Sequence, residues 1–161
     1  MSVECLLTPF LKEADAYIIP FFGKGAKRIV SLGSDLDRAA DLSLEKPFGS
    51  EGGLRVLNVP AQNRLVLLVL AGFGEELPSA RNLFLRAAGA FRKCRDGQIK
   101  HTAALMDNAP QLWKQDAYTE ALFRLPELVS YADAGKKAEN GGFESVAFVT
   151  QNKGLQPLLT S

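Results

Sequence analysis

The stretch RLVLLVLAGFGEEL, residues 64–77, decides the fold class of this chain. Its first part, residues 65–71, is apolar at every position, which is typical of a parallel strand covered on both faces. The chain then turns through Gly72-Phe73-Gly74 and continues into polar, helix-forming residues. Many nucleotide-binding sites begin with a strand, a glycine turn and a helix, so this turn is the first candidate for a phosphate site.

The segments on both sides repeat this alternation of apolar and amphipathic stretches. The helical spacing of apolar residues is clearest in residues 81–94, and it is found again from Asp116 to about Ala134. Strands are predicted at residues 3–7, 16–22, 54–59, 65–71, 99–107 and 144–150, and a further helix begins at Ser34. The alternation predicts an α/β chain, a three-layer α/β/α sandwich with a mostly parallel, mixed sheet of about six strands.

Local signals refine these elements. Ser34 is the expected N-cap of the first helix, with Asp37 placed where the acid of a capping box would sit. Pro20 is expected to end the second strand, because proline donates no ladder hydrogen bond. Pro126 lies inside the last helical pattern and predicts a kink or two abutting helices. Gly141-Gly142 is expected to be a turn.

The length of the chain, 161 residues, suits a single domain. We expect residues 1–150 to form that domain, and residues 151–161 to be a loose C-terminal tail or the start of a linker. The sheet's edge is expected at residues 3–7, where the apolar run is short. Residues 54–59 alternate in polarity, which leaves open which of their two faces is buried.

Charge and composition exclude several partners. Nineteen basic and eighteen acidic side chains leave a net charge of +1, so no long-range field favours nucleic acid or an anionic membrane. No segment has the ~18 to 20 apolar residues of a membrane span, and no signal peptide is recognised at the N-terminus. Cys5 and Cys94 sit among apolar residues and predict buried free thiols in a reducing compartment. We therefore expect a cytoplasmic protein.

The turn at Gly72-Phe73-Gly74 lacks the rest of a phosphate-binding motif. A dinucleotide fingerprint requires a third glycine where Leu77 stands. Glu75 and Glu76 would repel an anion at the place where backbone N–H groups should attract one. The sequence therefore favours a tight structural turn that requires a positive φ angle.

Gly23-Lys24-Gly25, which follows the second predicted strand, is the better candidate for an anion-binding loop. The lysine supplies a positive charge, and the glycines allow the backbone to approach a ligand closely. Any strand-to-helix connection can use two glycines, so a purely structural loop remains the alternative.

Signals for metal binding and nucleophilic catalysis are missing. His101 is the single histidine and lies within a predicted strand, where a packed or half-exposed role is expected. Asp35, Asp37 and Asp41 share a helix and are explained by exposure to solvent. No Cys-x-x-Cys, His-x-x-x-His or Gly-x-Ser-x-Gly pattern occurs. We assign no catalytic, cofactor-binding or metal-ligating residue beyond the weak anion-loop candidate.

Several stretches resemble the N-terminal domain of the leucyl aminopeptidase family, the cytosolic two-metal exopeptidases. EADAYIIPFF (13–22) is similar to a strand near the start of that domain, and LVLLVLAGFGEE (65–76) to its central strand and glycine turn. Residues 79–107 resemble the following helix and strand. Residues 118–150 resemble the late helix with its Ser130-Tyr131 pair, a lysine-bearing loop and the last strand. The similarity extends over roughly residues 3–150.

The resemblance implies a macro-domain-like fold without catalytic machinery. In that family two divalent metals, zinc or manganese, and the catalytic lysine and arginine lie in a C-terminal domain that no stretch of this chain matches. The implied role is structural, in assembly or substrate access, with the chain's own catalytic domain as partner if a longer parent exists. The isolated domain is then expected to be a monomer or a weak dimer.

The sequence departs from the family at two places. Glu75-Glu76 replaces a lysine after the glycine turn, and ADAGKK follows Tyr131 in place of the family's usual residues. The second departure puts in doubt any role of that loop in contacting a catalytic domain.

The likeness to macro domains also supports an alternative, a stand-alone module for a nucleotide or an ADP-ribose-type ligand. ADAYIIP is similar to the Asp-Ala-Ile-Val strand of those domains. However, Pro20-Phe21-Phe22 stands where they place an asparagine-containing segment and a run of glycines, which argues against a diphosphate pocket.

Overall fold

The computed structural model describes residues 1–7, 13–61, 63–130 and 143–160. Within these residues six strands form one sheet in the order β1-β6-β5-β2-β4-β3, in which β3 is antiparallel to β4 and the other neighbours are parallel. The strands are β1 (Ser2–Leu7), β2 (Ala16–Phe21), β3 (Gly53–Ala61), β4 (Arg64–Gly72), β5 (His101–Leu105) and β6 (Ser145–Thr150). The α-helices are α1 (Ser34–Ser43), α2 (Ala80–Asp96) and α3 (Asp116–Ser130).

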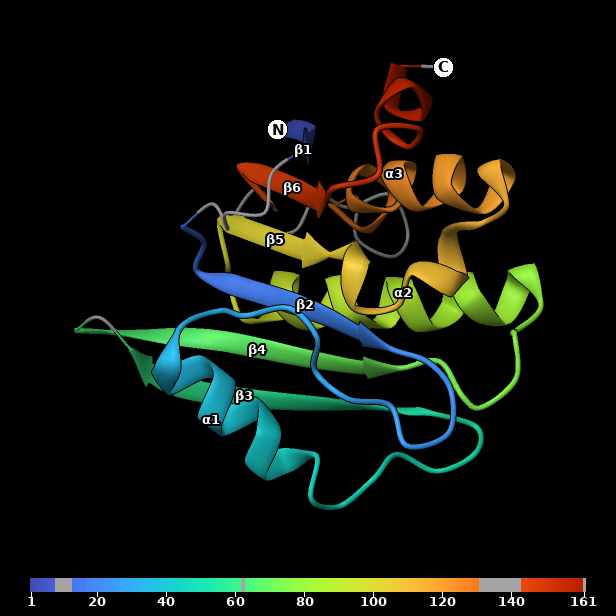
Figure 1. Cartoon of the computed structure of the whole chain (residues 1–161). Helices are drawn as coiled ribbons and strands as arrows, with labels where there is room; N and C mark the ends of the chain where they lie inside the picture. The colour runs from blue at the N-terminus through green and yellow to red at the C-terminus, as the bar shows by residue number, and fades with distance from the viewer. Residues whose placement is uncertain (8–12, 62, 131–142, 161) are drawn as a thin grey trace.

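Helices cover both faces of the sheet, with α1 on one side and α2 on the other (Figure 1). Successive residues of a strand point to opposite faces. Val69 of β4 therefore packs in the core beneath α2 and α3, whereas Leu68 and Leu70 pack in the core beneath α1. All three side chains are fully buried, and each such burial stabilises the fold by about 1.5–3 kcal/mol. The predicted three-layer sandwich with a mostly parallel, mixed sheet is confirmed.

Pro20 is accommodated in β2 because the pairing of β2 with β5 has already ended. The register joins β2 to β5 from Ala16 to Ile18, whereas pairing with β4 continues to Phe21. Pro20 therefore does not end the strand as predicted, since β2 includes one further residue. The predicted edge strand is confirmed, because within the described chain β1 pairs with β6 alone.

Two predictions about helix ends and breaks are corrected. The N-cap of α1 is Gly33, with φ 105°, and no side chain caps this helix end. Ser34 is already helical, and the Asp37 carboxylate accepts hydrogen bonds from Leu32 N and Ser31 Oγ instead. Pro126 lies inside a continuous α3, so the alternative of two abutting helices is wrong.

Strand β3 shows the alternation that the sequence predicted and settles which face is buried. Arg55, Leu57 and Val59 point inward, toward the α1 side, whereas Leu54 and Val56 are exposed. The exposed face is the one that α2 covers at the neighbouring strand β4, because Val56 pairs with Val69. Helix α2 therefore leaves the apolar surface at this edge of the sheet uncovered.

The residues after Thr150 are packed rather than loose. Leu155 is buried, and Leu158 and Leu159 lie against the core beneath α2 and α3. The short helix η4 (Gln156–Thr160) contributes a hydrogen bond from Gln156 Nε2 to the carbonyl of Cys5 in β1. The expectation of a loose tail is therefore corrected, because this segment closes the core beside β1 and α3. The predicted turn at 141–142 lies outside the described residues.

Both cysteines are free and buried, as their apolar surroundings predicted. Burial raises the pKa of the Cys94 thiol to about 12. Burial, followed by the nearby charge of Asp107, also raises the pKa of Cys5. In the described part of the chain, no helix combines the length and apolar character needed to cross a membrane.

Candidate functional site

The carboxyl ends of β2, β4 and β5 meet at one edge of the sheet, because these strands are parallel. The chain leaves β2 toward α1 on one face and leaves β5 toward α3 on the other. A crevice between two strands whose connections diverge in this way is the usual ligand site of open α/β sheets. The crevice between β2 and β5 is therefore the first place to look for a site.

Asn108 fills this crevice with a network of hydrogen bonds. It ends the short helix η1 (Met106–Asn108), directly after β5, and is 5% exposed. Its Oδ1 accepts from Ile29 N at 2.6 Å and Val30 N at 3.2 Å. Its Nδ2 donates to Pro20 O at 2.8 Å and to Lys27 O at 3.4 Å. The loop that follows β2 is thus bound to the end of β5, and the chain's own backbone occupies the crevice.

A cluster of charges holds the same loop from the other side. Arg28 donates two hydrogen bonds of 3.0 Å to the Asp41 carboxylate, lies 3.5 Å from Asp37, and donates to Val30 O. The hydrogen bond with Asp41 is the main cause of the raised pKa of Arg28. Solvent exposure alone therefore does not explain Asp37 and Asp41, because both carboxylates bind the guanidinium.

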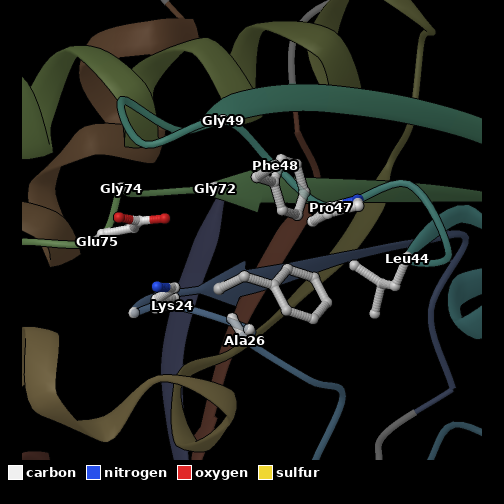
Figure 2. Close-up of a pocket in the computed structure, with 12 residues that line it drawn as sticks. Lys24, Ala26, Leu44, Pro47, Phe48, Gly49, Gly72, Gly74 and Glu75 are labelled. Atoms are coloured by element: carbon white, nitrogen blue, oxygen red, sulfur yellow. The ribbon is translucent and has the colours of Figure 1, made fainter.

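A pocket of about 330 Å³ lies beside the filled crevice. The loops that follow β2 and β4 form part of its wall, and the connection from α1 to β3 completes it (Figure 2). Its lining consists of Phe21, Gly23, Lys24, Gly25, Ala26, Leu44, Pro47, Phe48, Gly49, Gly72, Gly74 and Glu75. The volume falls within the range of roughly 300–1,000 Å³ that small-molecule sites occupy.

The structure brings together the two glycine turns that the sequence presented separately. The N–H of Gly23 donates to the carbonyl of Gly74 at 2.9 Å, which joins the loop after β2 to the loop after β4. Gly23, Gly25 and Gly74 have φ angles of 96°, 67° and 89°. The positive φ predicted for the turn after β4 is therefore confirmed at Gly74, and this turn also forms part of the pocket wall.

Phe48 forms the apolar wall of the pocket and explains why Gly72 is a glycine. A Cβ atom at Gly72 would lie 2.8 Å from the Phe48 ring. The ring also packs 5.6 Å from that of Phe21, centroid to centroid. The guanidinium of Arg55 lies over the Phe48 ring, 4.4 Å from its centroid. The same guanidinium donates hydrogen bonds to the carbonyls of Ser43 and Pro47. No pattern in the sequence indicates this wall, because Phe48 lies between the helix predicted to begin at Ser34 and the strand predicted at residues 54–59.

The two charged side chains of the pocket have opposite signs and lie at the same end. Figure 2 shows Lys24 and Glu75 together at one end, and Leu44 and Pro47 at the other. Both charged residues are exposed. Neither forms an ion pair with another described residue. The candidate loop Gly23-Lys24-Gly25 thus does line a pocket, but Glu75 balances its positive charge.

His101 lies at the opposite edge of the sheet, at the start of β5. Its Nδ1 is 2.8 Å from Ser145 Oγ, its Nε2 is 3.4 Å from Glu144, and its side chain is 48% exposed. The predicted half-exposed position is confirmed, and His101 does not line the pocket of about 330 Å³. Among the described residues, no three His, Cys, Asp or Glu side chains come together as metal ligands.

The sequence matches no family model and no curated protein, whereas its fold matches solved structures. A variant of tomato leucine aminopeptidase aligns with 99% of this chain at a TM-score of 0.67 and 14% identity. The macro domain of ganglioside induced differentiation associated protein 2 aligns with 98% of this chain at a TM-score of 0.61 and 14% identity, and the match spans 82% of the macro-domain chain. A Trypanosoma brucei macrodomain in complex with ADP aligns with 98% at 0.59 and 9% identity, and the match spans 66% of it.

These likenesses define the class of fold. The chain has a macro-domain-like α/β fold, as the resemblance predicted. The same fold occurs in part of the aminopeptidase, since this chain spans 35% of that protein's length. At such low identities the comparisons establish the fold and leave the choice between the aminopeptidase and macro-domain roles to the site.

Replacing Asn108 by alanine should destabilise the protein by about 2–4 kcal/mol, because two backbone N–H groups and two carbonyls lose their buried partner. Urea unfolding followed by fluorescence measures this change. Asn152→Ala is the matched control, since its exposed carboxamide accepts one hydrogen bond from Gly154 N and its loss should cost less than about 1 kcal/mol. Equal stabilities of the two variants would show that Asn108 does not anchor the loop.

Replacing Gly72 by alanine should displace the Phe48 ring and cost about 1–3 kcal/mol, because the new methyl group overlaps the ring. Gly49→Ala is the matched control in the same pocket, since a Cβ there meets no atom within 4 Å. The free energies of unfolding of both variants should be compared with that of the unmodified protein. A Gly72→Ala variant as stable as Gly49→Ala would contradict the packing described for Phe48.

Proposed function

We propose that this chain is a non-catalytic domain of the kind found at the N-terminus of leucyl aminopeptidases, with a structural role in assembly or substrate access. The observation that carries this proposal is the crevice between β2 and β5, which Asn108 and the β2–α1 loop fill. In this fold the place that usually receives a ligand serves here to stabilise the domain. The likeness to tomato leucine aminopeptidase, which includes nearly the whole of this chain, supports the same assignment.

The parent activity that this role implies is metal-dependent removal of N-terminal residues from peptides. Two divalent metals, zinc or manganese, would activate water and polarise the scissile carbonyl in a separate catalytic domain. The described residues do not fit such a centre, because no three potential ligands of the usual kinds come together. The catalytic domain, in the same polypeptide or in a partner, would supply every metal ligand.

The open edge of the sheet offers a surface for contact with that catalytic domain. Leu54, Val56 and Leu65 are 36%, 40% and 63% exposed and lie on the sheet face that α2 leaves uncovered. Within the described chain, β3 pairs with β4 alone, so its other edge is available for hydrogen bonds. An apolar stripe beside an open strand edge suits burial against another domain.

The first test asks whether the native protein is part of a larger enzyme. Immunoblots of cells that contain the protein should show it in a species well above 17.5 kDa after native separation. After denaturing separation the band should also be larger than 17.5 kDa where the catalytic domain belongs to the same polypeptide. The purified chain with Mn²⁺ or Zn²⁺ should not hydrolyse leucine p-nitroanilide above the blank. Hydrolysis by the purified chain would refute the non-catalytic role, and a free 17.5 kDa monomer in cells would refute the domain role.

A matched pair of variants locates the contact surface. Val56→Ser should reduce the fraction of protein in the larger native species, because it removes part of the stripe. Leu128→Ser is the control, since Leu128 is 66% exposed on α3, away from this edge. Equal losses in both variants would place the contact elsewhere.

A stand-alone macro-type module that binds a nucleotide or ADP-ribose is the second candidate. The observation that favours it is Lys24, which lies between two glycines of positive φ and lines the pocket. A macrodomain of the same fold has been solved in complex with ADP. An observation against this candidate is that Glu75 lies at the same end of the pocket as Lys24, where its carboxylate would repel a diphosphate.

Calorimetric titration with ADP and ADP-ribose decides between the two candidates. A binding module should give saturable heat that Lys24→Gln abolishes and that Lys114→Gln, an exposed lysine outside the pocket, leaves unchanged. The structural role that we favour predicts no heat at ligand concentrations of about 0.5 mM, well above the dissociation constant of a functional nucleotide site.

A further inference from the structure

The pocket at the carboxyl edge separates polar and apolar contacts in a way that specifies a ligand. One end presents a positive and a negative side chain, Lys24 and Glu75 (Figure 2). Apolar side chains, Phe21, Phe48, Leu44 and Pro47, line the remainder. A ligand that matches this arrangement has both signs of charge at one end and an apolar body at the other.

Other classes of ligand match the pocket less well. A polyphosphate would carry at least two negative charges into a site whose own side chains sum to zero. A fatty acid would satisfy Lys24 but leave Glu75 facing a carboxylate. A sugar would require several side-chain hydrogen bonds, whereas the lining contains no hydroxyl, amide or imidazole side chain.

We propose that this pocket binds a free α-amino acid with an apolar or aromatic side chain, held as its zwitterion. The Lys24 ammonium would pair with the carboxylate of the ligand, and the Glu75 carboxylate with its ammonium group. Both ligand charges are carried by groups on one carbon, so the side chain projects away from them, toward Phe48 and Leu44. The pocket volume of about 330 Å³ is sufficient for such a molecule. This binding activity is separate from the structural role proposed above.

The pocket is held in place before any ligand arrives. The hydrogen bond from Gly23 N to Gly74 O fixes the loop that carries Lys24 against the loop that carries Glu75. The guanidinium of Arg55 lies on the Phe48 ring and donates to the carbonyls of Ser43, the last residue of α1, and of Pro47, in the connection to β3. These contacts fix the apolar wall. A site that needs little reorganisation loses less affinity to ordering. The exposed ion pairs are individually weak, so we expect a dissociation constant of about 0.1–1 mM.

The test is a titration of isotope-labelled protein with L-phenylalanine, followed by the amide resonances in two-dimensional NMR. Saturable shifts are expected at residues 23–26 and at Gly72, Gly74 and Glu75, which line the pocket. Two analogues each remove one charge: N-acetyl-L-phenylalanine has no ammonium, and L-phenylalaninamide has no carboxylate. Each analogue should bind about threefold to fivefold more weakly than the amino acid.

Charge variants of the pocket make the test specific. Lys24→Gln should weaken binding of L-phenylalanine about threefold to fivefold and leave binding of L-phenylalaninamide unchanged. Glu75→Gln should weaken binding of L-phenylalanine by the same factor and leave binding of N-acetyl-L-phenylalanine unchanged. Lys114→Gln and Glu127→Gln are the matched controls, because both residues are exposed on or near α3, outside the pocket.

Three results would overturn the proposal. No saturable shift with about 10 mM L-phenylalanine would exclude the site at any useful affinity. Shifts that both charge variants leave unaltered would show that the zwitterion is not recognised. Binding of ADP in this pocket without binding of L-phenylalanine would assign it to the nucleotide candidate. The titration uses the purified chain and does not require a catalytic domain. A negative result would therefore not affect the proposed structural role, and refutation of that role would not affect the proposed amino-acid site.

Discussion

The buried carboxamide of Asn108 is the interaction on which the arrangement at the carboxyl edge depends. One side chain satisfies four backbone groups from the β2–α1 loop and the end of β2, and it does so from the residue that ends η1, just after β5. A backbone group buried without a partner is costly, so the loop cannot leave this position cheaply. The crevice between β2 and β5 is consequently closed, and Arg28 with its two aspartates secures the other side of the loop.

Because this crevice is filled, the pocket at the carboxyl edge of the sheet lies nearer to β4 and β3. There, Gly72 leaves room for the Phe48 ring, and the Gly23–Gly74 hydrogen bond joins the two turns. In this macro-domain-like fold, the pocket of about 330 Å³ therefore lies between the loops after β2 and β4 and the connection from α1 to β3.

The fold was largely predictable because burial leaves a local record in the sequence. Residues 65–71 are apolar at every position since both faces of β4 are covered, and α2 has the three-and-four spacing of a helix with one buried side. The predictions that the structure corrects concern residues at which a tertiary contact replaces the expected local one. Asp37 was expected in a capping box but accepts hydrogen bonds from Leu32 N and Ser31 Oγ, and residues after Thr150 pack where a tail was expected.

The sequence by itself determined the layers, the succession of strands and helices along the chain, and the glycine turns, because periodicity and backbone constraint are properties of neighbouring residues. The order of the strands within the sheet came from the structure. It also pointed to Gly23-Lys24-Gly25 and to the positive φ that Gly74 adopts. Only the tertiary structure decided that these turns share one pocket, that Glu75 balances Lys24, and that Asn108 closes the crevice. These contacts join residues about 50 to 90 positions apart, and no local pattern encodes such a pairing.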